Sequence, residues 1–240
     1  MNLQPLPDGY ETTRGALHQI AFFVLSPVRY AATRRMGLRA APGGFGTPEF
    51  DRRVARVEGA SIVYEEPDRI ATQTITTVRT AADFVGIDYQ VDWYHGDFRD
   101  PLPPVDPDAP LDVDDVASRA LGQWFNFGFD VLEELRGHGS DQDEVSEVQL
   151  WPEHFDVAFE MGSEASGSRA SYGASPGDRA HARPYVYVAA WGEIDRENPY
   201  WNDSNFNGSS LGFDDLLAAP DPQQTALAFL LDGYRILASS

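Results

Sequence analysis

The sequence contains neither cysteine nor lysine, and all 18 of its basic residues are arginines. Without cysteine there is no disulfide, no thiol nucleophile and no thiolate metal site. Without lysine there is no Schiff-base chemistry, no anchor for pyridoxal phosphate and no Walker-type phosphate-binding lysine. These two absences exclude several classes of enzyme before any motif is considered.

Positive charge and long apolar runs are also scarce. The formal net charge is −20, from 38 acidic and 18 basic residues, so nucleic acid and anionic membrane surfaces would repel the chain. No apolar run reaches the length of a membrane span, and residues 1–13 lack the basic and apolar regions of a signal peptide. We therefore expect a cytoplasmic protein that binds neither nucleic acid nor membrane. Its oligomeric state is left open.

The residues that are present predict a folded α+β protein. Hydrophobic residues make up 42% of the chain and aromatic residues 12%, which is typical of a globular core. We expect a single domain over residues 1–240, with helices packed on a largely antiparallel sheet built from an early meander and a late strand pair. Helical spacing and caps predict helices from Thr12 or Thr13 to Val28, then at 78–85, 112–136, 213–218 and 222–237. Strands are predicted at 37–41, 53–57, 61–65, 69–76, 155–161 and 185–191.

The remaining segments are expected to be loops. Residues 1–11 form an extended N-terminal lead, and 88–111 and 162–183 are long loops by composition. The PGGFGTP segment at 42–48 is a turn-rich loop without the spacing of a dinucleotide fingerprint. His18 lies among apolar residues and is expected to be a core histidine. The aromatic residues between Trp124 and Phe129 are expected in the core as well.

The predicted strand at 155–161 carries the strongest candidate site. Its period of two places His154, Asp156 and Glu160 on the face opposite the apolar residues. A histidine beside two carboxylates suits a divalent cation, such as Zn²⁺, Mn²⁺ or Fe²⁺, or acid–base chemistry. The alternative is an ordinary solvated outer face of a sheet.

The loop at 162–183 offers further groups to this face. Asp178 and His181 are available as a fourth metal ligand, and Asp178 with Arg179 can bind a ligand if the loop folds over the sheet. We therefore predict a small-molecule-binding or metal-assisted enzyme whose catalytic and metal candidates are His154, Asp156 and Glu160. The reaction and the substrate are not specified by these residues.

Two other functions stay open. A binding module without catalysis would use an aromatic surface formed by Trp151, Tyr185, Tyr187 and Trp191. A calcium loop at 203–214 would take its oxygen ligands from Asp203, Asn205, Asn207 and Asp214, with Gly208 at the sixth position. Against calcium, the twelfth position is aspartate instead of glutamate, and an Asn/Gly turn is the alternative.

The segment from Gly173 to Gly177 matches the G-x-S-x-G pattern of a hydrolase nucleophile elbow. The residue after the nucleophile must donate its backbone N–H to the oxyanion hole, and Pro176 has none. The segment before Ser175 is also expected to be loop instead of strand. We therefore interpret the match as a turn.

The runs LWPEHFD, YGASPGD and PYVYVAAW, together with ALHQIAFFVLSPVRYAATRR near the N-terminus, resemble an uncharacterised family of actinobacterial proteins. The tail LGFDDLLAAPDPQQTALAFLLDGY fits the end of the same family, so the resemblance covers nearly the whole chain. It implies one domain. It transfers no activity and no catalytic residue.

Overall fold

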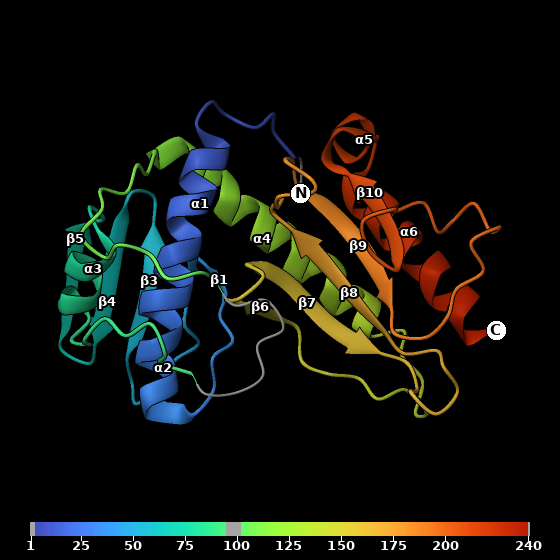
Figure 1. Ribbon diagram of the computed structural model, residues 1–240, viewed down its shortest axis with the longest axis horizontal. Helices are drawn as coiled ribbons and strands as arrows, with labels where there is room; N and C mark the ends of the chain where they lie inside the picture. Colours follow the sequence, from blue (N-terminus) through green and yellow to red (C-terminus); the bar gives the residue numbers. More distant parts are fainter. Residues whose placement is uncertain (1–2, 95–101, 240) are drawn as a thin grey trace. The chain divides into compact units, whose positions relative to one another are not determined.

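The computed structural model describes residues 3–94 and 102–239. It confirms an α+β fold with two antiparallel sheets of five strands each (Figure 1). The expectation of one sheet shared by the early meander and the late strands is wrong, because the strands form two separate sheets, with an isolated antiparallel bridge between Leu38 and Leu150. The chain divides into two compact units. The N-terminal unit comprises residues 6–125 and 150–155, and the C-terminal unit comprises 1–5, 126–149 and 156–240.

The first sheet lies in the N-terminal unit and has the strand order β1-β2-β3-β4-β5. The predicted meander is confirmed, with turns at Gly59 and at Pro67-Asp68. The prediction of a loop at 42–48 is wrong, because its middle forms β2. A Cβ atom on Gly44 would lie 2.3 Å from the carbonyl oxygen of Val57, so only glycine allows this pairing. The strands are β1 (Arg39–Ala41), β2 (Gly44–Gly46), β3 (Val54–Glu58), β4 (Ser61–Glu66) and β5 (Arg69–Thr74).

The first predicted helix is longer than expected and contains a widened turn. It runs as α1 (Tyr10–Ile20), the π-helical segment η1 (Ala21–Leu25) and α2 (Ser26–Thr33). Pro27 is accommodated in the first turn of α2, directly after the π-helical segment. The N-terminal lead ends at Gly9 instead of residue 11, and Thr13 does not cap the helix: its hydroxyl accepts a hydrogen bond from the N–H of Asp114.

His18 is a core residue of the N-terminal unit, as predicted. Its ring stacks on Phe155, with ring centres 4.9 Å apart, and its Nε2 lies 2.9 Å from the carbonyl oxygen of Pro152. Burial lowers the pKa of His18 from 6.5 to about 4, against the opposing effect of that carbonyl contact. The imidazole is therefore neutral at physiological pH.

The depressed pKa of His18 predicts a dependence of stability on pH. The unfolded chain binds more protons at this residue between pH 6.5 and about 4, so the free energy of unfolding falls as the pH drops through that window and levels off below it. The His18→Gln variant keeps an N–H donor for Pro152 and should lose this contribution, which is worth roughly 3 kcal/mol for a buried group. Urea unfolding of both proteins from pH 7 to 4 measures the difference. Parallel stability curves would contradict the assignment.

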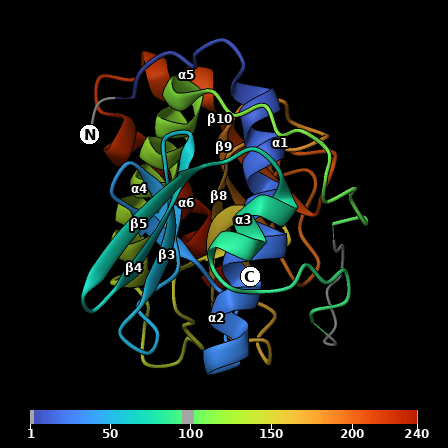
Figure 2. The ribbon, with the colours of Figure 1, turned by 90° about the vertical axis from the view of Figure 1, so that its left-hand side faces the viewer.

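Two further helices contribute residues to the N-terminal unit. Figure 2 shows α3 (Val78–Phe84) lying across the helical segment formed by α1, η1 and α2. The helix α4 (Asp115–Arg136) confirms the predicted helix at 112–136, and the boundary between the two units falls within it, after Phe125. A Cβ atom on Gly122 would lie 2.6 Å from the Cα of Gly44, so glycine at both positions lets helix and strand approach closely. The predicted loop at 88–111 has no helix or strand in residues 88–94 and 102–111, and its residues 95–101 lie outside the described chain.

Leu121 provides a test of the buried side of α4. Its side chain is fully buried, whereas Val116 on the same helix is 62% exposed. The Leu121→Ala variant should lose about 2–4 kcal/mol in the free energy of unfolding, through lost burial and the cavity left behind. The matched Val116→Ala variant should change it by less than about 0.5 kcal/mol. Guanidinium unfolding measures both, and equal losses would place the buried face elsewhere.

The second sheet has the order β10-β9-β8-β7-β6, with each described pair antiparallel. The prediction of an unbroken loop at 162–183 is wrong, because residues 170–175 form β8. The segments at 155–161 and 185–191 are therefore not neighbours, and each pairs with β8. Alanine, serine and glycine dominate β8, so its composition did not suggest a strand. The strands are β6 (Gln149–Trp151), β7 (Asp156–Met161), β8 (Ala170–Ser175), β9 (Tyr185–Ala190) and β10 (Gly208–Gly212).

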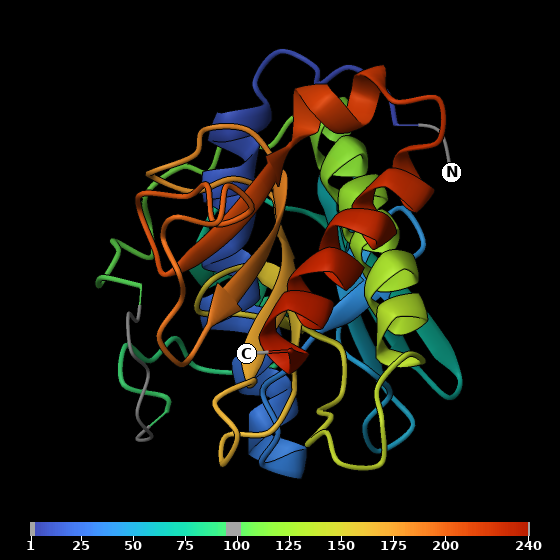
Figure 3. The ribbon, with the colours of Figure 1, turned by 90° about the vertical axis from the view of Figure 1, so that its right-hand side faces the viewer.

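Helices cover the apolar face of this sheet. α5 (Phe213–Ala218) and α6 (Pro222–Ala238) confirm the two C-terminal predictions, and Figure 3 shows α6 running along the sheet. A Cβ atom on Gly233 would lie 2.9 Å from a methyl carbon of Val188, so α6 packs closely on β9. Within the described residues, no helix combines the length and the hydrophobicity needed to cross a membrane.

Candidate functional site

The two faces of the second sheet differ in chemistry. Val157, Ala174 and Val186 form one row across β7, β8 and β9, and all three are buried on the apolar face. The neighbouring row on the opposite face contains Ser175 and Tyr185. Polar and aromatic groups gather on this second face and in the loops beside it. We call it the tyrosine–aspartate face and define it by Asp156, Asp178, His181, Tyr185, Tyr187 and Asp203.

A glycine in β8 positions the first pair of groups on this face. Gly173 lies opposite Tyr187 in the β8–β9 pairing, and a Cβ atom there would lie 2.4–2.5 Å from the tyrosine ring and hydroxyl. The ring therefore crosses β8, and its hydroxyl donates a short hydrogen bond to Asp156 at the start of β7. Burial, and then the charge of Asp156, raise the pKa of Tyr187 well above its ordinary value. This tyrosine remains a neutral donor.

Asp178 and Tyr185 form the second pair. The backbone N–H groups of Ala180 and His181 donate to one carboxylate oxygen of Asp178 at 2.6 and 2.7 Å. The hydroxyl of Tyr185 donates to the other oxygen at 2.6 Å. Burial raises the pKa of Tyr185, and the bond to Asp178 raises it further, so this tyrosine is also neutral. The turn beginning at Gly177, whose φ is 99°, thus fixes a carboxylate at the edge of the face.

His181 and Asp203 form the third pair. The Nε2 of His181 lies 2.9 Å from an oxygen of Asp203, whereas its Nδ1 lies 3.7 Å from Asp178. Asp203 is buried, and it also accepts hydrogen bonds from the hydroxyl of Ser210 and the N–H of Asn205. Burial works to raise the pKa of Asp203, but these hydrogen bonds and His181 together hold it below its ordinary value. Asp203 is therefore an ionised, fixed partner for the imidazole.

Aromatic rings lie among these carboxylates. His181 and Tyr185 have ring centres 4.4 Å apart, and Tyr185 and Tyr187 have theirs 5.9 Å apart. Phe206 contacts both Tyr187 and His181 edge to face, at 6.0 and 6.4 Å. His181, Tyr187 and Phe206 are each partly exposed, so the face presents aromatic surface as well as negative charge.

The predicted grouping of His154, Asp156 and Glu160 does not follow the expected geometry. Phe155 has a φ of 58°, so the extended alternation begins only at Asp156, and His154 lies exposed in a turn of the N-terminal unit. Asp156 is bonded to Tyr187, whereas the carboxylate of Glu160 lies 2.6 Å from Arg169. Among residues 3–94 and 102–239, no three histidine or acidic side chains are grouped to hold a metal ion.

Two candidate residues of the 162–183 loop, Asp178 and His181, do lie on the same face as Asp156. Asp178 is bonded to Tyr185, His181 lies against Asp203, and Asp156 is bonded to Tyr187. The alternation along residues 155–161 did not predict these contacts. Arg179 is exposed. The alternation of Tyr185 and Tyr187 along one strand was the signal that could have placed both hydroxyls on this face.

The predicted aromatic surface is divided. Tyr185 and Tyr187 belong to the tyrosine–aspartate face, and Trp151 belongs to the N-terminal unit. Trp191 is 44% exposed; Arg169 lies over its ring at 4.9 Å, and its indole N–H donates to Ser171.

The calcium loop that the spacing of residues 203–214 left open as an alternative is not formed. Strand β10 begins at Gly208, the position where that loop would make its turn. Asn207 donates its amide to the carbonyl oxygens of Ala190 and Gly192, and Asp214 pairs with Arg183. Asp203 and Asn205 are bonded to each other, whereas Asn207 and Asp214 make separate contacts.

Ser175 ends a strand, so the expectation of a loop before it is wrong. The serine is buried, and its oxygen accepts a hydrogen bond from the N–H of Gly177 at 3.2 Å. Pro176 follows the serine and has no N–H to offer an oxyanion, so the segment still lacks this part of a nucleophile elbow.

Comparisons of the chain with protein-family models, with curated proteins and with solved structures found no match. The resemblance to an uncharacterised actinobacterial family therefore stays a prediction.

The close approach of Tyr187 to Gly173 predicts a strong effect of a single methyl group. The Gly173→Ala variant must displace the ring, and overpacking of this kind costs about 1–3 kcal/mol. The matched Gly212→Ala variant in β10 meets only a side-chain oxygen at 3.8 Å and should cost little. Thermal and urea unfolding measure both losses. In a Tyr187→Ala background the cost of Gly173→Ala should largely disappear, and a double-mutant cycle without coupling would contradict the contact.

Proposed function

We propose that the tyrosine–aspartate face binds a small organic cation. The main support is that three aspartates lie on one face. Asp156 and Asp178 each accept a hydrogen bond from a tyrosine, and Asp203 lies against His181. Burial raises the pKa values of the two tyrosines, which are therefore neutral, so the charge of the face comes from its carboxylates and from His181. Even with His181 protonated, these six side chains carry a net negative charge.

The aromatic groups support the same class of ligand. A cation within about 6 Å of an aromatic ring is attracted to the negative face of that ring. Tyr187, His181 and Phe206 are partly exposed and lie beside Asp178, whose side chain is 41% exposed. Carboxylates next to aromatic surface suit an ammonium group better than a neutral or anionic ligand. The proposal keeps the expectation of small-molecule binding and uses Asp156, Asp178 and His181 from the predicted set.

A second candidate function is proton transfer on the bound ligand. Asp203 fixes His181 through Nε2, as a carboxylate orients a histidine that acts as an acid or base. The Nδ1 atom is buried and has no hydrogen-bond partner within the described chain, and the carboxylate of Asp178 lies 3.7 Å from it. A ligand that exchanges a proton with His181 would have to reach this buried nitrogen from the side of Asp178.

The binding proposal is tested by NMR titration with tetramethylammonium at 150 mM salt, with tert-butyl alcohol as a neutral compound of similar shape. Tetramethylammonium should cause saturable shifts in the amides of residues 178–187, and tert-butyl alcohol should not. Asp178→Asn keeps the shape of the side chain and removes its charge, so it should weaken binding about 3- to 30-fold.

Glu134→Gln is the matched control, since Glu134 is exposed, lies in the same unit and belongs to α4, which packs at Gly128 against Ala174 and Val157 of the apolar face. It should leave the affinity unchanged, because an exposed charge on that side of the sheet is screened by salt. Equal shifts with tert-butyl alcohol, or unchanged affinity of Asp178→Asn, would refute the proposal. Proton transfer is tested separately, by the pH dependence of the His181 ring signals with and without tetramethylammonium.

A further inference from the structure

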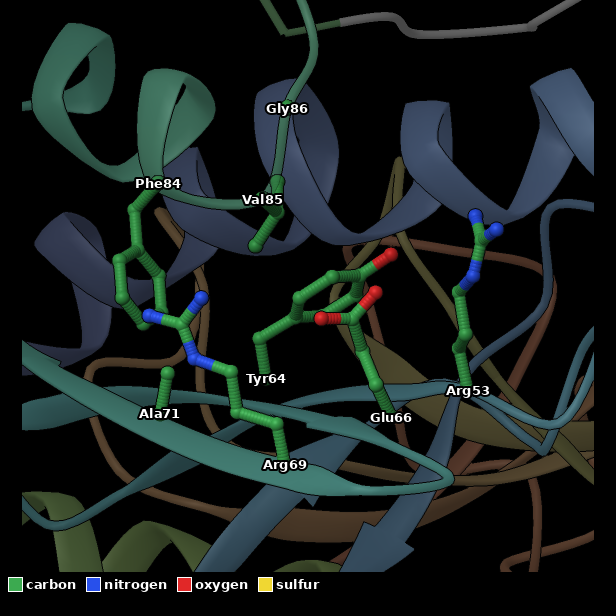
Figure 4. Close-up of a pocket in the computed structure, with 8 residues that line it drawn as sticks. All are labelled: Arg53, Tyr64, Glu66, Arg69, Ala71, Phe84, Val85 and Gly86. Atoms are coloured by element: carbon green, nitrogen blue, oxygen red, sulfur yellow. The ribbon is translucent and has the colours of Figure 1, made fainter.

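A pocket of about 360 Å³ lies in the N-terminal unit, between the first sheet and the end of α3 (Figure 4). Tyr64 and Glu66 enter it from β4, and Arg69 and Ala71 enter it from β5. Arg53, directly before β3, lies across the pocket from Arg69, and Phe84 at the end of α3 closes one side. The volume lies within the range of small-molecule sites.

Strand register explains why these side chains meet. Tyr64 pairs with Ala71, and Glu66 pairs with Arg69, in the antiparallel ladder of β4 and β5. Because side chains two residues apart share a face, the four lie on the same side of the sheet. The small Ala71 leaves room above the strand beside the ring of Tyr64. The pocket thus has an aromatic and apolar floor and a charged rim.

The polar groups of this pocket are unpaired. Within residues 3–94 and 102–239, the side chains of Arg53, Arg69, Glu66 and Tyr64 have no hydrogen bond or ion pair. Both arginines are exposed, whereas Tyr64 and Glu66 are half-buried. Glu66 is the ladder partner of Arg69 but forms no ion pair with it. The lining therefore carries two guanidinium groups and one carboxylate that are all available to a ligand.

Some other arginines of the same unit are paired: Arg56 in β3 binds Glu58 and Glu65, Arg79 binds Asp108, and Arg119 binds Asp115. Arg35, Arg39 and Arg52 resemble Arg53 and Arg69 in forming no ion pair within the described chain, but they do not line the pocket. Two unpaired guanidinium groups around one pocket, in a protein with a charge of −20, are a local positive site.

We propose that this pocket binds a small organic anion consisting of an aromatic ring with a carboxylate. Guanidinium groups match carboxylates in geometry and can bind them through two parallel hydrogen bonds. Tyr64 and Phe84 contact the ring of the ligand, and its carboxylate binds to one of the two arginines, Arg69 beside Phe84 or Arg53 on the opposite side of the pocket. The net charge of the lining is +1, from two arginines and one glutamate. This site is independent of the tyrosine–aspartate face, which lies in the other unit and favours the opposite charge.

Glu66 adds selectivity to the site. Its carboxylate repels a ligand that presents a second negative charge next to it, and it accepts a hydrogen bond from a ligand N–H or O–H group. A hydroxyl or amino substituent on the ring therefore strengthens binding. A phosphate ion has charge but no ring, and it gains nothing from Tyr64 and Phe84.

The test is an NMR titration of the full chain with benzoate, benzyl alcohol and inorganic phosphate, each at the same ionic strength. Benzoate should cause saturable shifts in amides of residues 53, 64–71 and 84–86. Benzyl alcohol should bind at least about tenfold more weakly, because it lacks the charge. Phosphate should not displace benzoate at equal concentration.

Two variants separate the arginines from general charge effects. The Arg53→Gln/Arg69→Gln double variant should weaken benzoate binding about tenfold or more, and Arg69→Lys should weaken it less. Arg35→Gln is the charge control, because Arg35 is exposed in the same unit and does not line the pocket. All three arginines are exposed, so the variants should fold.

Equal binding of benzoate to the double variant and to the control would overturn the proposal. Equal affinity for benzoate and benzyl alcohol would also overturn the proposal. Displacement of benzoate by equimolar phosphate would overturn it too, because the pocket would then bind anions without selecting for the ring. Stronger binding of 4-hydroxybenzoate than of benzoate in the wild type, abolished in Glu66→Gln, would support the role given to Glu66. Equal binding of these two ligands would overturn that role.

Discussion

The polar face of the second sheet depends on the missing side chain of Gly173. Because no Cβ atom stands there, the ring of Tyr187 can cross β8, and its hydroxyl reaches Asp156 on the strand beyond. Any larger residue at this position would push the ring away from the sheet. Burial, followed by the charge of Asp156 and the hydrogen bond to it, raises the pKa of Tyr187 and keeps it neutral, and the same bond holds Asp156 at the start of β7. The neighbouring contacts of Tyr185 and His181 are arranged around this ring.

The absence of lysine and cysteine limits the chemistry of both candidate sites. The tyrosine–aspartate face uses carboxylates, phenols and one imidazole, which bind cations and move protons. The pocket of the first sheet uses two arginines and one glutamate over an aromatic floor. Each site lies in its own compact unit, and their charges are opposite. The acidic surface therefore does not prevent the protein from offering one site to anions, because local charge decides what a pocket attracts.

Several errors of sequence interpretation have local physical causes. β8 consists of small residues whose side chains do not suggest a strand, yet its backbone completes the ladders of β7 and β9. Gly44 and Gly173 lie in segments predicted to be loops, but each sits in a strand at a point where another chain segment or ring lies too close for a side chain. Phe155 adopts a left-handed backbone, and this single residue removes His154 from the face on which period two had placed it. None of these contacts can be predicted from the spacing of apolar residues in the sequence.

The sequence alone was sufficient for the class of fold, the helices and most strands, because the period of apolar residues depends only on local backbone geometry. It also indicated that His18 is buried and that Asp178 and His181 are candidate site residues. Only the tertiary structure decided which strands pair, and therefore which side chains meet. Tyr187 reaches Asp156, and Glu66 stands beside Arg69, through strand register, which depends on pairing between separate segments of the chain. Local periodicity determines which face of its own strand a side chain lies on, but it does not determine which strand pairs with that strand.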